Sequence, residues 1–182
     1  MEKFKTLESL ALPIARANVD TDQIVPARYL RKPRTDNFGE YLFRDLRHVL
    51  DEKNHAGARI VIAGRNFACG SSREQAVWAL YDYGFRAAIA PSFGDIFSSN
   101  ALKNGFLPVV LPEAVVSELL SFLQAKPGSK ISIDLEKQSV NDKYGFEIAP
   151  FAKKCLLEGL DEIDFTLSQA GRIADFEKGY QP

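Results

Sequence analysis

The chain has 182 residues, 46% of them hydrophobic and 26% charged, so we expect one globular domain over residues 1–182 with a sizeable buried core. Its formal net charge of −1 gives no electrostatic reason to expect binding to nucleic acid or to an anionic membrane surface. No stretch has the pattern of a signal peptide or of a membrane-spanning run, so the expected location is the cytoplasm.

The first elements along the chain are a strand and a polar turn. Residues 4–14 mix apolar and polar residues, and we expect a strand within them. The segment Asn18–Asp22 is rich in short polar side chains that bond to nearby backbone, which is typical of turns and helix caps. We expect it to cap a short segment that starts at Gln23. An EF-hand calcium loop is excluded, because the glycine and the distal glutamate that it needs are missing.

A basic loop follows this turn. Residues 26–34 hold the densest run of arginine and lysine in the chain. Such a run is ordinarily a solvated loop, whereas beside an anion site it would attract a dicarboxylate, and the local sequence leaves both interpretations open. Residues 42–50 favour a short helix, and residues 51–57 favour a polar loop.

The centre of the chain predicts a strand, a turn and a helix in close succession. The β-branched run Ile60–Ala63 is typical of a strand that is covered on both faces. Apolar residues recur at helical spacing over Ala76–Tyr83. Gly70 lies between them and permits backbone angles that other residues resist. Ser71 followed by Glu74 matches the capping box, so we expect the helix to begin at Ser71.

This predicted turn has the chemistry of an anion site. The first turn of a helix offers unpaired backbone N–H groups and the positive end of the helix dipole. Ser71 and Ser72 stand beside that end, and Arg73 adds a planar two-pronged donor for a carboxylate. A purely structural cap at Ser71 remains an alternative. A nucleophile elbow is excluded because Arg73 stands where that motif needs glycine, and no phosphate-loop lysine follows.

The second half of the chain alternates strands and helices. We expect strands at residues 86–90, 106–111, 130–135 and 146–149, and helices at residues 92–103, 113–124, 151–158 and 171–178. Such alternation implies parallel pairing of strands. The predicted class is therefore α/β, with a mostly parallel central sheet flanked by helices. The strands at 130–135 and 146–149 are expected to add a small antiparallel hairpin with its turn near Asn141-Asp142.

The chain has two cysteines, Cys69 and Cys155, and two histidines. Structural zinc normally takes four ligands and an iron–sulfur cluster at least three cysteines, so this chain builds neither by itself. A disulfide between the two cysteines is not expected in a cytoplasmic protein. We expect Cys69, within the candidate site, to be a small, partly buried residue.

Four stretches of the sequence together resemble one known family, the swivelling domain of the aconitase superfamily. They occur in family order and are Asn18–Ile24, Asn66–Gly84 with Gly70-Ser-Ser-Arg-Glu74 at its centre, Ala90–Phe97, and Leu157–Ile163. The resemblance implies a swivelling β/β/α fold. Among the branches of the family, the small subunits that act on isopropylmalate in leucine biosynthesis match most closely.

The resemblance also implies a reaction and a partner. It implies a hydro-lyase that isomerises a hydroxy-dicarboxylate by dehydration and rehydration. A [4Fe-4S] cluster would be carried by a separate large subunit and not by this chain, in a heterodimer or heterotetramer. Sister enzymes that act on citraconate, methylmalate or homoaconitate remain alternatives, as does an anion-binding module without catalytic activity.

Roles of individual residues follow from the same resemblance. Ser71 would act as the catalytic base, and the substrate carboxylates would be held by Ser72 and Arg73. Arg34 and Arg31, from the basic loop, would also bind substrate, and Tyr29-Leu30-Arg31 would sense its side group. The residues expected near the site are Asp20, Asp22, Cys69 and Gln75.

The sequence departs from the family pattern at three positions of the central motif. Gln75 stands where most members have histidine, and glutamine cannot exchange a proton near neutral pH. Ala68 stands where glycine is usual, and Val77 where proline is frequent. Residues 51–57 replace a longer insertion. None of these changes touches Ser71, so they leave the expected reaction class in place and bear on the choice of substrate.

Overall fold

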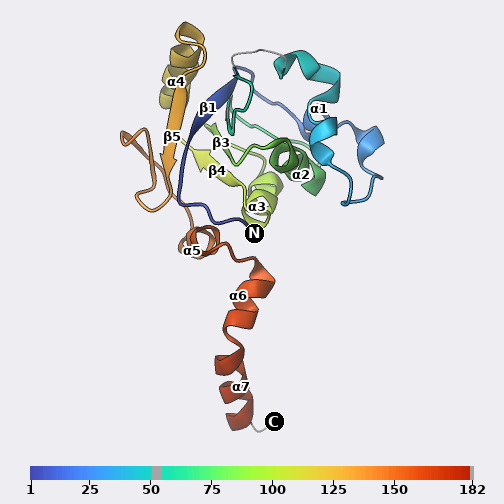
Figure 1. Cartoon of the computed structure of the whole chain (residues 1–182), viewed down its shortest axis with the longest axis vertical. Helices are drawn as coiled ribbons and strands as arrows, with labels where there is room; N and C mark the ends of the chain where they lie inside the picture. Colours follow the sequence, from blue (N-terminus) through green and yellow to red (C-terminus); the bar gives the residue numbers. More distant parts are fainter. Residues whose placement is uncertain (51–54, 181–182) are drawn as a thin grey trace.

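The computed structural model describes residues 1–50 and 55–180 and contains a mixed sheet in the order β4-β3-β2-β1-β5-β6-β7 (Figure 1). The strands β1 to β4 are parallel, and β5 runs antiparallel to β1 at the other side of the sheet. Their bounds are β1 Thr6–Ile14, β2 Ile60–Ala63, β3 Ala87–Ala90, β4 Leu107–Val110, β5 Lys130–Asp134, β6 Ser139–Val140 and β7 Tyr144–Gly145.

Helices cover both faces of this sheet. Their bounds are α1 Thr21–Ile24, α2 Glu74–Tyr83, α3 Asp95–Lys103, α4 Glu113–Ala125, α5 Pro150–Glu158, α6 Glu162–Ser168 and α7 Ala170–Gly179, with 3-10 turns η1 Ala27–Tyr29, η2 Phe38–Tyr41 and η3 Arg44–Val49. None of the helices in the described part of the chain is long and apolar enough to cross a membrane.

Both faces of the sheet are covered at β2 and β3, because these two strands are apolar at every position. All four residues of β2 are buried, as the β-branched run predicts. Val61 and Ala63 face one core cluster, which includes apolar residues of α2 and α3. Ile60 and Ile62 face the other, which includes apolar residues of α4 and α5. The predicted α/β class with a mostly parallel core is therefore confirmed.

The predicted hairpin has its turn in the right place but its second strand in the wrong one. Asn141 and Asp142 both have positive φ, at 53° and 50°, which is typical of a tight hairpin turn. Lys143 N–H donates to the carbonyl of Val140 at 3.1 Å across this turn, and the hairpin is formed by β6 and β7, with Val140 paired to Tyr144. The strand expected at residues 146–149 is absent, since Phe146 only bonds back to Gln138.

Three further predictions of secondary structure differ from the observed elements. The turn at Asn18–Asp22 does cap a short helix, but α1 begins at Thr21 and its N-cap is Asp20, which bonds reciprocally with Gln23. The short helix expected at residues 42–50 is the 3-10 turn η3. Two short helices were expected at the end of the chain, and α6 is an additional one, capped by Asp161. Of the loop expected at 51–57, residues 51–54 lie outside the described part.

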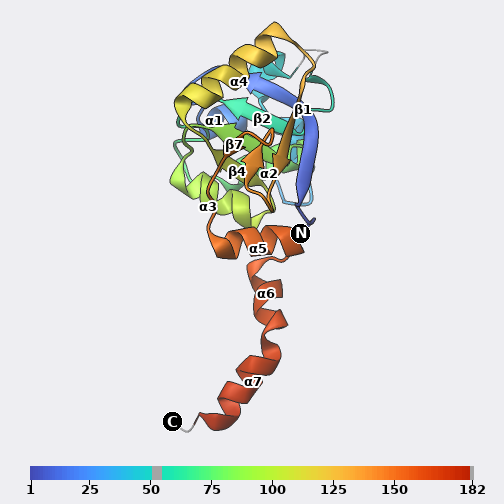
Figure 2. The same cartoon turned by 90° about the vertical axis from the view of Figure 1, so that its left-hand side faces the viewer.

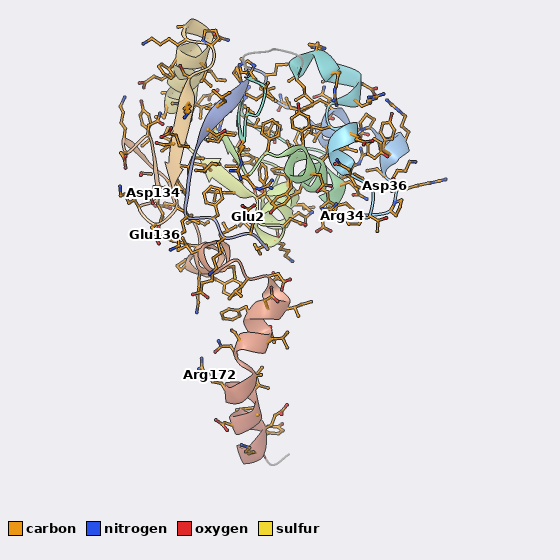
Figure 3. All side chains as sticks on the ribbon, viewed as in Figure 1. Glu2, Arg34, Asp36, Asp134, Glu136 and Arg172 are labelled. Carbon is orange, nitrogen blue, oxygen red and sulfur yellow. The ribbon has the colours of Figure 1, made fainter. Side chains whose placement is uncertain are left out.

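The last two helices, α6 and α7, form an arm that projects from the body of the protein (Figure 2). A ring contact between Phe165 and Phe151, with centroids 4.9 Å apart, joins the start of the arm to α5. Farther out, α7 has no buried residue, and Phe176 is 70% exposed. The side chain of Arg172 lies at the side of this arm, where it donates to the side chain of Gln169 at 3.1 Å (Figure 3).

Because α7 buries nothing against the core, deleting residues 170–182 should leave the free energy of unfolding within about 0.5 kcal/mol of the full chain. Urea denaturation of the two forms measures this difference. Leu156→Ala in α5 is the positive control, since this fully buried side chain should cost about 2–5 kcal/mol. A comparable loss from the deletion would mean that the arm packs on the body.

Candidate active site

The candidate site is the turn that joins β2 to α2, at the carboxyl end of the parallel strands. Two isolated bridges extend the sheet pattern into this turn, from Asp20 to Cys69 and from Phe67 to Phe93. The turn therefore lies between the segments that follow β1 and β3, just as β2 lies between those strands. Three of the four family motifs meet here, although they are far apart in sequence.

Backbone hydrogen bonds fix this arrangement. Thr21 N–H donates to the carbonyl of Cys69 at 3.0 Å, and its hydroxyl donates to the carbonyl of Ser71 at 3.1 Å. Ala68 N–H donates to the carbonyl of Val19 at 2.7 Å. On the other side, Phe67 N–H donates to the carbonyl of Ser92 at 3.0 Å. Buried backbone groups of the turn are thus paired with both neighbours, which holds it in one conformation.

The turn is tightly wound, and one glycine beside it has no room for a side chain. Asn66, Ala68 and Gly70 have φ of 58°, 56° and 88°, in the left-handed region that favours glycine. At Gly94, an added Cβ would lie 2.5 Å from the carbonyl oxygen of Ala68. The Ala90–Phe97 motif therefore contributes a glycine that lets two backbones approach closely.

The prediction that Ser71 caps the helix is wrong. Helix α2 begins at Glu74 with Arg73 at its N-cap position, and no side chain caps it. Thr21 and the backbone of Ser71 are bonded to each other, and Arg73 N–H donates to the carbonyl of Ser71 at 2.8 Å. These bonds form a separate turn before the helix. The hydroxyl of Ser71, on an exposed residue, is therefore not used as a cap.

The arginine of the motif is held at the start of α2. The side chain of Arg73 is 14% exposed and forms an ion pair with Asp22, and its guanidinium donates weakly to the carbonyl of Val25 at 3.5 Å. Ser72, beside it, is exposed. Two exposed serines, a guanidinium held in place and an uncapped helix N-terminus thus follow one another over residues 71–74, a set of groups suited to an anion such as a small dicarboxylate.

The residues expected near the site have distinct structural tasks. The carboxylate of Asp20 caps α1 by accepting from Gln23 N–H at 2.8 Å, and Asp22 pairs with Arg73. Cys69 is half-buried, as expected, and its backbone bridge to Asp20 supports the turn. The side-chain amide of Gln75 donates to the carbonyl of Leu30 at 3.4 Å, which ties the basic loop to α2.

The two arginines of the basic loop lie at different places. Arg31 is exposed and follows Leu30, whose carbonyl is bonded to α2 beside the candidate site. Arg34 lies near the other end of α2, where both terminal nitrogens of its guanidinium donate to Asp82, at 2.8 and 3.0 Å. Asp82 belongs to the central motif, but no feature of the sequence identifies Arg34 as its partner.

The described residues include no group of three or more cysteine, histidine or acidic side chains placed to hold a metal ion. Cys69 and Cys155 are both free thiols. Burial, with nearby Glu158, raises the pKa of the Cys155 thiol, which disfavours the thiolate that binds metals. Cys155 also lines a cavity of about 170 Å³ between α3, α5 and α6, which includes none of the residues of the candidate site.

The comparisons with known proteins agree with this geometry. The family model of the aconitase C-terminal domain matches residues 1–114, and the chain belongs to this family. The 3-isopropylmalate dehydratase small subunits of Leptospira interrogans and Erythrobacter litoralis are 45% and 50% identical to it, over 98% and 97% of this chain and 94% and 91% of theirs. Within the family, the chain thus groups with the 3-isopropylmalate dehydratase small subunits.

A solved structure supports the same placement. The crystal structure of 3-isopropylmalate dehydratase from Methanocaldococcus jannaschii matches with a TM-score of 0.69 and 28% sequence identity. The match covers 94% of this chain and 99% of that chain. The expected relationship to the aconitase superfamily is confirmed.

Proposed function

We propose that this chain is the small subunit of a two-subunit hydro-lyase that interconverts 2-isopropylmalate and 3-isopropylmalate in leucine biosynthesis. The observation that carries the proposal is the name shared by relatives 45–50% identical over nearly the whole chain. The candidate site is consistent with it, because Ser71, Ser72 and Arg73 are consecutive residues immediately before α2.

Ser71 is the proposed general base. The reaction removes a proton from the carbon next to the departing hydroxyl, and rehydration of the alkene at the neighbouring carbon completes the isomerisation. A serine hydroxyl is ordinarily far too weak a base, so its alkoxide must be stabilised by positive charge and by N–H donors. The uncapped first turn of α2 and the guanidinium of Arg73 supply both.

Ser72 and Arg73 are the proposed carboxylate binders. Arg73 can present two parallel N–H donors to a carboxylate, which fixes its orientation as well as its charge. In the described structure the guanidinium of Arg73 is paired with Asp22. The side chain of Asp22 is 52% exposed, so it has room to move aside. A substrate carboxylate would then replace one anion on Arg73 by another.

The cluster implied by the family does not fit the residues of this chain, since Cys69 and Cys155 lie on different elements without further ligands among the described residues. We assign a [4Fe-4S] cluster to the large subunit. A second argument favours such a partner: Ser71 and Ser72 are exposed, and an alkoxide is stabilised far more strongly where water is excluded. We assign the cover over the site to the large subunit.

A sister hydro-lyase of the citraconate, methylmalate or homoaconitate type is the second candidate. The observation behind it is Gln75, which replaces the usual histidine and bonds to Leu30 of the loop expected to sense the side group. Co-expression with a candidate large subunit, followed by anaerobic assay on a panel of 2- and 3-substituted malates, decides between them. Turnover of another substrate in preference to isopropylmalate would overturn the proposed substrate.

The chain purified alone should be colourless and without dehydratase activity. The reason is that two cysteines cannot supply the three or more ligands of an iron–sulfur cluster. Absorbance spectra and turnover assays on the isolated chain, and on the same chain mixed with large subunit, measure this. Cluster absorbance in the isolated chain would contradict the two-subunit assignment.

Arg31→Ala should change preference among substrates that differ in their side group. Arg31 is exposed and adjacent to Leu30, which is bonded to α2 beside the site, so its loss alters the surroundings of the substrate rather than the base. The measurement is kcat/KM of the assembled enzyme on the malate panel. An equal loss on every substrate would remove Arg31 from a role in specificity.

A further inference from the structure

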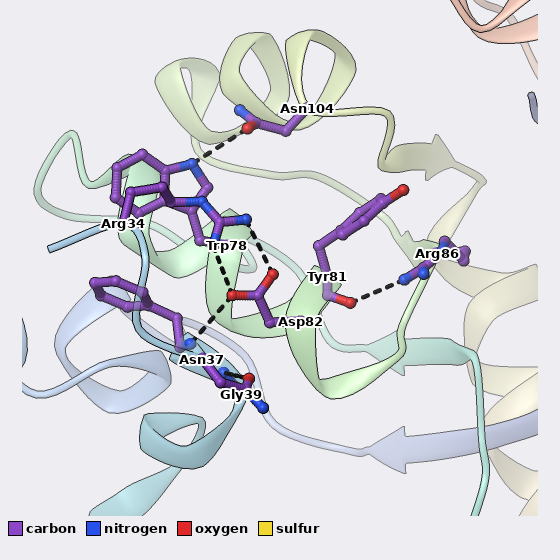
Figure 4. A network of polar contacts seen from close by, with 9 residues as sticks. Arg34, Asn37, Gly39, Trp78, Tyr81, Asp82, Arg86 and Asn104 are labelled. Atoms are coloured by element: carbon purple, nitrogen blue, oxygen red, sulfur yellow. Dashed lines mark hydrogen bonds and ion pairs between the residues drawn. The ribbon is translucent and has the colours of Figure 1, made fainter. Parts of the chain in front are cut away.

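One two-pronged ion pair of the basic loop connects it to α2 at a place away from the candidate base. Arg34 and Asp82 form a two-pronged ion pair, and Asp82, whose side chain is 16% exposed, also accepts from Phe38 N–H at 3.1 Å (Figure 4). The carboxylate therefore joins two points of the loop to the last turn of α2. Bidentate pairs of this kind fix geometry as well as charge.

The guanidinium of Arg34 is enclosed on a second side by an aromatic ring. It lies over Trp78, 5.1 Å from the ring centroid, and the indole N–H donates to the side chain of Asn104 at 3.2 Å. Asn104 in turn donates to Glu74 at 2.8 Å, in the first turn of α2. A continuous set of contacts thus runs from Arg34 to the residue that follows Arg73.

The segment of residues 25–38 is attached along the length of α2. At the end near the site, Arg73 and Gln75 hold the carbonyls of Val25 and Leu30 by long, weak bonds of 3.5 and 3.4 Å. At the far end the Arg34–Asp82 pair is short and charged. Among the polar contacts between this segment and α2, that pair is therefore the strongest.

Close packing supports the same attachment. An added Cβ at Gly39 would lie 2.7 Å from the backbone nitrogen of Tyr83, so the end of the segment rests directly on the backbone of α2. Phe38 is fully buried and its ring makes an edge contact with Trp78, at 5.4 Å between centroids.

We propose that the Arg34–Asp82 pair is a latch that positions residues 25–38 beside the site and thereby sets substrate affinity. The proposal rests on the proposed function. Arg34 then acts as a positioning residue, because both of its terminal nitrogens already serve Asp82. Releasing the latch lets the segment leave its place on α2. The apparent affinity for substrate then falls in proportion to the fraction of molecules in which the segment is still correctly placed.

The latch is tested first in the isolated chain, without any activity. Trp78 is the single tryptophan of the sequence and lies under Arg34, so its fluorescence reports on the latch. Arg34→Ala and Asp82→Asn should shift its emission and speed amide hydrogen exchange over residues 26–37 about 10-fold or more. Asp82→Asn keeps an acceptor for Phe38 N–H, which protects the fold.

A matched control is the ion pair of Lys143 and Glu118, which is distant in sequence from both partners of the latch. Lys143→Ala should change neither the Trp78 emission nor the exchange of residues 26–37. If Arg34→Ala and Asp82→Asn also change neither while remaining folded, the latch is disproved.

The second test is a double-mutant cycle in the assembled enzyme. Arg34→Ala and Asp82→Asn should each raise KM for isopropylmalate about 5- to 10-fold with kcat within about twofold, and the double variant should be no worse than either. A large fall in kcat from Arg34→Ala with a harmless Asp82→Asn would overturn the latch and make Arg34 a carboxylate binder. An inactive wild-type assembly would count against the proposed function, while fluorescence and exchange still decide the latch.

Discussion

Ser71→Ala is expected to reduce turnover of the assembled enzyme roughly 100- to 10 000-fold while the protein stays folded. The reason is that the variant loses the hydroxyl proposed to abstract the proton, and that this hydroxyl makes no hydrogen bond within residues 1–50 and 55–180. Helix α2 begins at Glu74 without a side-chain cap, so the free energy of unfolding should change by less than about 0.5 kcal/mol. Turnover assays and urea denaturation measure the two effects separately.

Ser71→Asn makes the test of the base sharper. Asparagine has polar atoms at the same place but cannot serve as an alkoxide base, so this variant should fold, assemble with the large subunit and be inactive. Ser121→Ala, at an exposed serine on α4, is the matched control and should keep full turnover. If Ser71→Asn retained a tenth of normal turnover, the base would have to be sought elsewhere, on the large subunit first.

Arg73→Lys should cost about 2–4 kcal/mol of transition-state stabilisation, because a point charge cannot replace the planar fork that grips a carboxylate. The variant keeps the charge and can still pair with Asp22, so the loss reflects geometry rather than net charge. The measurement is kcat/KM of the assembled enzyme, with anaerobic handling throughout.

Two companion variants define what the Arg73 result means. Arg65→Lys changes an exposed arginine on the same turn and should leave kcat/KM unchanged. Asp22→Asn removes the resident anion from Arg73 and should have a smaller effect than Arg73→Lys, since the fork itself remains. Equal effects of Arg73→Lys and Arg65→Lys would indicate a general electrostatic contribution without a specific carboxylate contact.

Much of the fold could be predicted because its signals are local. The run Ile60–Ala63 is apolar at every position, and only a strand covered on both faces buries all of it. Asn141-Asp142 favours positive φ, which fixes a tight turn. The end of that hairpin was misplaced, because two-residue strands carry too little alternation to be located from sequence.

The site divides in the same way. The sequence by itself determined that Ser71, Ser72 and Arg73 lie together between a buried strand and a helix, since neighbours in a short turn cannot separate. The resemblance of Asn18–Ile24 to the family motif also predicted that Asp22 lies near these three residues, and Asp22 pairs with Arg73. Tertiary structure decided that α2 starts at Glu74, because the backbone of Ser71 is held by Thr21, a residue 50 positions earlier.

The pairing of the basic loop was decided by tertiary structure alone. Arg34 and Asp82 are 48 residues apart. Neither the sequence around the exposed arginine nor that around the helical aspartate indicates which residue is its partner. Their pairing depends on the path of the loop over α2, which in turn depends on the burial of Phe38 and the close approach of Gly39 to Tyr83. Local sequence fixes which chemical groups are present, whereas the packing of distant segments fixes which of them meet.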